Sequence, residues 1–194
     1  MNLPNKLTLL RVVLIPFFLL FMYLDIPYHF LIALLIFSAA SITDALDGKI
    51  ARARNLVTNF GKFLDPLADK VLVIAALTVC VEFSEVNMSA IPLIIIIARE
   101  FMVSGLRLLA ANSGIVVAAG IWGKLKTAFT MAAIVVILLW LSLCYDFDLG
   151  LSDSLVSAVD NVAVPVLIWI STVLTIISGG VYLKGYWHLI DSDK

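Results

Sequence analysis

The sequence contains few charged residues, and this scarcity is the first constraint on what the protein can be. Only 14% of its 194 residues are Asp, Glu, Lys or Arg, whereas 62% are hydrophobic. Soluble globular domains are about half apolar and roughly one quarter charged. Because a soluble core of this size cannot bury so large an apolar share, the composition predicts an integral membrane protein.

Cysteine and net charge are scarce as well. Cys80 and Cys144 are the only cysteines, and they lie in apolar stretches without the C-x-x-C or His/Cys spacing that a zinc site needs. We interpret both as small buried hydrophobic residues. The net charge of −1 creates no overall field that would recruit an acidic partner, and we expect no nucleic acid partner.

Long apolar runs fill most of the chain. A helix needs about 20 mainly apolar residues to cross a bilayer. Six runs meet this length, and no repeat, low-complexity tract or soluble linker separates them: 7–25, 28–53, 61–84, 89–111, 122–145 and 162–187. The sequence predicts an all-α fold, with one membrane domain over residues 1–194 built from six transmembrane helices.

The placement of basic residues predicts the orientation of these helices. The segments near 25–28, 82–89 and 146–160 contain no Lys or Arg and carry acidic residues instead, whereas the opposite helix ends are basic. Lys and Arg collect on the cytoplasmic side of membrane proteins. We therefore expect both termini in the cytoplasm of a cell that carries this protein in its plasma membrane, where membrane lipids surround it.

Four aspartates lie near the cytoplasmic ends of the second and third predicted spans. Asp44 and Asp47 are three residues apart and Asp65 and Asp69 are four apart, so each pair occupies one helix face. Carboxylates that close together cannot all ionise in a low-dielectric site unless cations neutralise them. Hard divalent ions with oxygen ligands suit such a cage, which predicts one or two Mg²⁺ or Mn²⁺ ions.

Two other interpretations of these aspartates stay open at this point. They would be purely structural if each paired with a basic neighbour such as Arg52, Lys62 or Lys70. A cation or proton-coupled transporter also places acids within the membrane. Transporter sites usually lie near the bilayer midplane at broken helices, however, whereas these acids lie at the rim beside a basic turn.

Small residues accompany the acids. Gly48, Ala51 and Gly61 leave space where the bulk of a ligand would enter, although such residues also serve close helix packing. Arg52 adds a planar donor fork suited to phosphate. Acids, small residues and an arginine together suggest a metal-bound pyrophosphate.

The spacing of these residues resembles the signature of the CDP-alcohol phosphotransferase family. Every fixed position of D-x-x-D-G-x-x-A-R, eight residues, G, three residues, D, three residues, D is matched between Asp44 and Asp69. Eight specified residues at fixed spacing make a specific signal. The opening segment 2–11 and the run 61–70 resemble the bacterial branch of that family, which makes phosphatidylglycerophosphate.

The resemblance implies a reaction and a division of roles. CDP-diacylglycerol would donate a phosphatidyl group to the 1-hydroxyl of sn-glycerol 3-phosphate in phospholipid biosynthesis, with release of CMP. Asp44, Asp47 and Asp65 would hold the divalent ions, and Asp69 would complete the cage and act as general base. The resemblance also implies a homodimer.

The same resemblance assigns two substrate sites. The one for CDP-diacylglycerol would comprise Asn5, Thr8, Asp47, Gly48, Ala51, Arg52 and Gly61, although Asn5 and Thr8 are equally suited to capping the first helix. The phosphate of the acceptor needs cations, for which Lys62, Arg107, Lys124 and Lys126 are the candidates; these residues would otherwise only mark the cytoplasmic side. Arg99 and Glu100 lie deeper, where we expect an ion pair that fixes the fourth helix, with a role in the substrate path as the alternative.

Other functions remain as alternatives. The motif cannot separate glycerol 3-phosphate from inositol phosphate, phosphatidylglycerol or serine as acceptor, although a basic pocket favours a phosphorylated alcohol over serine. A cation-coupled transporter would move its substrate without releasing a nucleotide. The sequence shows no broken midplane helix that would support it.

Overall fold

The computed structural model describes residues 3–53, 59–112, 120–147 and 149–187, without the side chains of 3–4, 44–53, 59–63, 65–66 and 112. Over the described residues the chain is helical and contains no strand, which confirms the predicted all-α class. The helices are α1 (Leu3–Tyr23), α2 (His29–Ala53), α3 (Asn59–Glu82), α4 (Ala90–Asn112), α5 (Ile121–Leu141), η1 (Ser142–Asp146), α6 (Asp153–Ala158), η2 (Val159–Ala163) and α7 (Val164–Tyr186).

Within the part of the chain that the structure describes, three helical runs are long and apolar enough to cross a membrane. They are Asn5–Tyr23, Ile121–Asp146 and Asp153–Tyr186. The described side chains of α2 supply a shorter apolar run, His29–Thr43. Helix α4 has the length of a span but carries Arg99, Glu100 and Arg107.

The last run begins earlier than the sequence predicted. Its helix starts at Asp153 rather than near 162, and it widens into the π-helical turn η2 before α7. Pro165 explains the wide turn, because proline has no N–H to donate and its ring clashes with the carbonyl four residues before it. The polar residues Asp160 and Asn161 hid this first part of the helix from an argument based on apolar runs.

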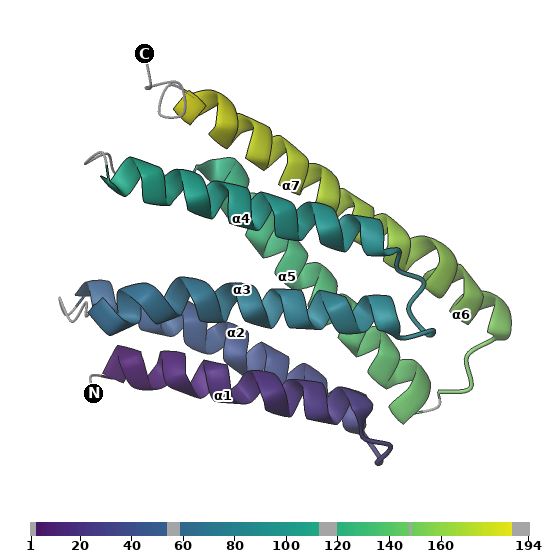
Figure 1. The fold of residues 1–194 in the computed structure, drawn as a ribbon. Coiled ribbons are helices and arrows are strands. Elements are labelled where there is room, and N and C mark those ends of the chain that lie inside the picture. The colour runs from purple at the N-terminus through teal and green to yellow at the C-terminus, as the bar shows by residue number, and fades with distance from the viewer. Residues whose placement is uncertain (1–2, 54–58, 113–119, 148, 188–194) are drawn as a thin grey trace.

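Successive long helices run in opposite directions (Figure 1). The starts of α1, α3 and α5 and the ends of α2, α4 and α7 therefore lie together at one end of the bundle, which we call the basic end. Its described side chains include Lys6, Arg107, Lys124 and Lys184. The described connections at the opposite end, 24–28, 83–89 and 149–152, contain neither Lys nor Arg.

The helices form two groups, which are joined by contacts of α2 with α5 and of α3 with α4 and α5. Helix α1 packs on α2 and α3, α7 packs on α4 and α5, and α2 contacts α5. Each long helix contributes at least one nearly inaccessible side chain to a common core, including Phe18, Phe37, Leu72, Ile96, Ile134 and Ile168. Large apolar side chains also cover the outside, such as Leu35, Ile94 and Phe101 at 60%, 62% and 66% exposed. An outer surface of this kind suits lipid rather than water.

Candidate active site

The end of α2 and the start of α3, which carry most of the signature residues, both lie at the basic end of the bundle (Figure 1). The last turns of α2 carry Asp44, Asp47, Gly48, Ala51 and Arg52, and the first turns of α3 carry Gly61, Lys62 and Asp65. The two helices are in contact, and both are continuous over these positions, as the spacing argument required. The side chains of these residues lie outside the described part of the structure.

Asp69 is the signature aspartate whose side chain the structure describes. It is partly buried on α3 and lines a cavity of about 850 Å³ between α3, α4 and α5. Arg107 and Lys124 line the same cavity. The structure thus brings the predicted general base together with two of the cations predicted to bind the acceptor.

Arg107 is held by an aromatic residue of the last helix. Its Nη2 atom donates a hydrogen bond of 3.1 Å to the hydroxyl oxygen of Tyr182. The guanidinium carbon also lies 5.5 Å from the centre of the Tyr182 ring, within the range of a cation–π contact. Lys124 is exposed in the first turn of α5.

Lys126 lies inside the bundle and does not line the large cavity, although its partner Glu100 does. It is 4% exposed, and its Nζ atom donates to Glu100 Oε1 at 2.6 Å. It lines a second, much smaller cavity that Asp69 and Lys70 also reach. Its charge is therefore paired with a carboxylate in the structure, and its role in binding the acceptor phosphate stays a prediction.

The predicted ion pair between Arg99 and Glu100 is confirmed. Arg99 Nη1 donates to Glu100 Oε1 at 2.7 Å, the same oxygen that Lys126 contacts. Arg99 Nη2 reaches α7 and donates to Ser178 Oγ at 2.7 Å. The pair is thus part of a network that ties α4 to both α5 and α7.

The start of α1 points polar side chains inward. Asn5 and Thr8 are 7% and 1% exposed, and one turn further Arg11 is fully buried. Thr8 is the sixth residue of α1, which places it past the positions that cap a helix. The capping interpretation therefore fails for Thr8, and its inward direction agrees with a place beside a polar ligand.

The sequence match decides what kind of site this is. The CDP-alcohol phosphatidyltransferase family matches residues 1–177. The chain belongs to this family. The resemblance drawn from the aspartate spacing is confirmed, and the chain is an enzyme of the CDP-alcohol phosphatidyltransferase type.

Bacterial relatives extend the similarity over the whole chain. The CDP-diacylglycerol–glycerol-3-phosphate 3-phosphatidyltransferase of Bacillus subtilis is 41% identical over 205 residues, which cover 100% of this chain and 99% of the relative. The enzyme of the same name from Rickettsia bellii is 40% identical, covering 94% of each chain. That of Escherichia coli K12 is 44% identical over 135 residues, covering 69% and 74%.

Two polar residues of the cavity between α3, α4 and α5 were not among the predicted site residues. Lys70 lines the cavity and donates a hydrogen bond to Ser104 on α4. Ser104 in turn donates to the backbone carbonyl of Glu100 at 2.6 Å. The position of Lys70, directly after Asp69, was the available signal, because a long lysine side chain can reach a cavity that its neighbour also lines.

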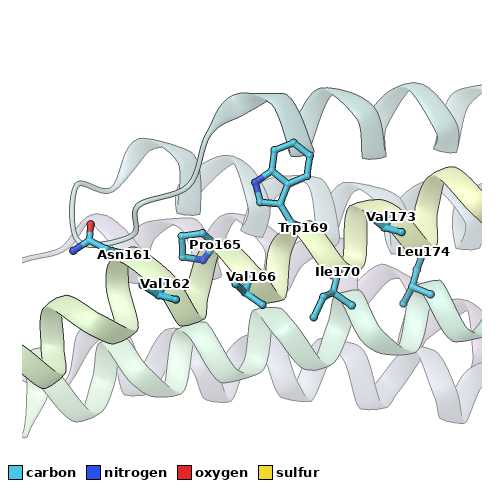
Figure 2. Close-up of a pocket in the computed structure, with 8 residues that line it drawn as sticks. All are labelled: Asn161, Val162, Pro165, Val166, Trp169, Ile170, Val173 and Leu174. Carbon is cyan, nitrogen blue, oxygen red and sulfur yellow. The ribbon is translucent and has the colours of Figure 1, made fainter.

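A separate groove on the outside of α7 does not suit phosphatidyl transfer (Figure 2). This groove of about 450 Å³ is lined by Pro165, Trp169 and other apolar side chains, with Asn161 as its polar member. Its described lining contains no charged residue and none of the residues around Asp69. A phosphate would find no cation in it.

Proposed function

We propose that the chain transfers the phosphatidyl group of CDP-diacylglycerol to the 1-hydroxyl of sn-glycerol 3-phosphate, giving phosphatidylglycerophosphate and CMP. The observation that carries this proposal is the end-to-end similarity to the Bacillus subtilis enzyme named for that reaction. The cavity that Asp69, Arg107 and Lys124 share supports the proposal, because it gathers a carboxylate and two cations.

The proposed reaction is a displacement at phosphorus in which Asp69 removes a proton. The C1 oxygen of glycerol 3-phosphate attacks the phosphorus that bears the diacylglycerol group, and the bond from that phosphorus to CMP breaks. Asp69 takes the proton of the attacking hydroxyl as general base. The electron pair of the broken bond leaves with the phosphate of CMP.

The four signature aspartates fit a divalent cation by their chemistry, because their oxygens are the ligands that Mg²⁺ and Mn²⁺ prefer. Asp44, Asp47, Asp65 and Asp69 would hold one or two ions. When bound, such an ion offsets the negative charge that builds on the pyrophosphate oxygens. Of these four side chains, the structure describes that of Asp69, which lines the cavity and supports the proposal.

The remaining signature residues are proposed to hold CDP-diacylglycerol. Arg52 and Asp47 would contact its polar part, and the small residues Gly48, Ala51 and Gly61 would leave room for the nucleotide. The inward direction of Asn5 and Thr8 supports their inclusion.

The acceptor phosphate is proposed to bind at the basic wall of the cavity. Arg107 offers a planar fork that matches phosphate oxygens, and Lys124 offers a point charge beside it. Lys62 remains a candidate. This wall favours glycerol 3-phosphate or inositol phosphate over serine, which carries no phosphate.

The topology proposed from the sequence suits this site. All six long helices would cross the plasma membrane of a bacterium, with both termini and the basic end in the cytoplasm, where glycerol 3-phosphate is dissolved. The chain would form one domain and assemble as a homodimer, as its family resemblance implies. Lipid would enter from the bilayer and the acceptor from the cytoplasm.

An acceptor panel tests the proposal. The purified protein in mixed micelles is given CDP-diacylglycerol with glycerol 3-phosphate, inositol phosphate, phosphatidylglycerol or serine in turn, and CMP is measured after chelation and after addition of Mg²⁺ or Mn²⁺. We expect release with glycerol 3-phosphate and either ion. Faster release of CMP with another acceptor would show that this other molecule is the acceptor substrate. Uptake of a solute into vesicles without any release of CMP would favour a transporter.

A further inference from the structure

Tyr182 joins three helices through one oxygen atom. It lies on α7 and is 5% exposed. Its hydroxyl oxygen accepts a hydrogen bond from Arg107 Nη2 of α4 at 3.1 Å and another from the backbone N–H of Gly120 at 3.0 Å. Gly120 is the residue that precedes the first turn of α5.

The ring of Tyr182 supports the same arrangement. The guanidinium carbons of Arg107 and Arg99 lie 5.5 and 5.6 Å from its centre. Arg99 is itself fixed by Glu100 and Ser178. The tyrosine ring therefore presents an electron-rich face, held in a fixed position, to the guanidinium of Arg107.

The start of α5 depends on the hydroxyl as well. The carbonyl of Gly120 accepts hydrogen bonds from the N–H groups of Gly123 and Lys124, at 3.1 and 3.2 Å. Its own N–H points to Tyr182. One contact thus sets where the first turn of α5 begins, and with it the position of Lys124 on the wall of the cavity.

We propose that Tyr182 is a positioning residue for the acceptor phosphate: it fixes the direction of the Arg107 guanidinium and the start of α5, so that Arg107 and Lys124 converge on one anion. This rests on the proposed function, in which these two cations bind the phosphate of glycerol 3-phosphate. A long exposed arginine loses rotamer freedom when it binds a ligand, and a residue that orders it beforehand removes that cost from binding.

The decisive variant is Tyr182→Phe, which keeps the ring and removes the oxygen. Loss of a hydrogen bond to a charged group corresponds to roughly tenfold in an equilibrium constant. We expect the KM for glycerol 3-phosphate to rise about tenfold, while kcat and the KM for CDP-diacylglycerol change by less than about twofold. Tyr145→Phe is the matched control, because it makes the same chemical change at the opposite end of the bundle, where Tyr145 is 46% exposed.

A double-mutant cycle with Arg107→Ala separates positioning from a general structural effect. If Tyr182 acts through Arg107, adding Tyr182→Phe to Arg107→Ala raises the KM for glycerol 3-phosphate by much less than tenfold. Independent effects that multiply, or equal rises in the KM of both substrates, would overturn the proposal. An acceptor KM that moves alone cannot come from partial unfolding.

The outcomes also separate this inference from the proposed function. If the wild-type protein releases no CMP with glycerol 3-phosphate, the proposed function fails. An Arg107→Ala variant with an unchanged acceptor KM would show that the phosphate binds elsewhere. If Arg107→Ala raises that KM and Tyr182→Phe does not, the role of Tyr182 alone is refuted.

Discussion

Lys126 Nζ lies 2.6 Å from Glu100 Oε1, which makes a buried ion pair between α5 and α4. Arg99 shares the same carboxylate oxygen at 2.7 Å, so one acid contacts two cations inside the bundle. The side chains of Glu100 and Lys126 are 17% and 5% exposed. Charges at this depth are costly unless they are paired, and the geometry supplies the pairing.

Glu100→Gln should destabilise the bundle strongly. The substitution leaves Arg99 and Lys126 buried without their carboxylate, and breaking a buried pair typically costs about 3–5 kcal/mol. We expect a lower unfolding midpoint in detergent by differential scanning fluorimetry. Asp25→Asn, in the exposed connection between α1 and α2, is the control with the same kind of charge change. Equal midpoints for the two variants would show that the network contributes little.

Lys124 and Lys126 should respond differently to the same substitution. Lys126→Met removes a buried partner of Glu100, and we expect mainly a loss of thermal stability, by roughly 5 °C or more. Lys124→Met removes an exposed cation of the cavity, and we expect mainly a higher KM for glycerol 3-phosphate. Both quantities are measured for both variants. The reverse pattern would return Lys126 to the acceptor site that the sequence first suggested.

Two adjacent glycines of α7 give a matched pair for the contact between α7 and Arg99. A Cβ atom at Gly179 would lie 3.1 Å from Arg99 Cγ, whereas one at Gly180 would have nothing within 4 Å. Alanine favours helix by about 0.5–1 kcal/mol at either position, but overpacking costs about 1–3 kcal/mol at the first. We expect Gly180→Ala to unfold at a higher temperature than Gly179→Ala. The opposite order would mean that Arg99 moves aside freely.

Asp69→Asn should separate catalysis from binding. The amide cannot accept the proton of the acceptor hydroxyl, so we expect a loss of about 10²–10⁴ in kcat and a smaller loss in CDP-diacylglycerol binding. Binding is measured by equilibrium dialysis with labelled substrate, and turnover by CMP release. Asp153→Asn, at the opposite end, should alter neither. Equal losses in turnover and binding would argue against a base.

Much of the fold could be predicted from the sequence because the relevant signals are local. Runs of apolar residues mark five of the long helices closely, and the spacing of the acids depends only on helix geometry. The early start at Asp153 was missed because polar residues interrupt the apolar pattern while the backbone stays helical. The length and hydropathy of an apolar run indicate which residues can be buried in lipid, but they do not indicate the residue at which the helix begins.

The cavity was only partly predictable for a different reason. Arg107 and Tyr182 are 75 residues apart, and Glu100 and Lys126 are 26 apart. Nothing local distinguishes Lys126, which turns inward to an acid, from Lys124, which faces the cavity two residues earlier. Only the packing of α4 against α5 and α7 decides which cation is engaged by the protein and which faces a ligand.

Transfer of radiolabelled glycerol 3-phosphate into lipid is the most direct test of the central claim. Purified protein with CDP-diacylglycerol and a divalent ion should convert the label to phosphatidylglycerophosphate, with one CMP released per lipid formed. Chelation should stop both, and Mg²⁺ or Mn²⁺ should restore both. Release of CMP without label in the lipid, or no product at all from folded protein, would contradict the account.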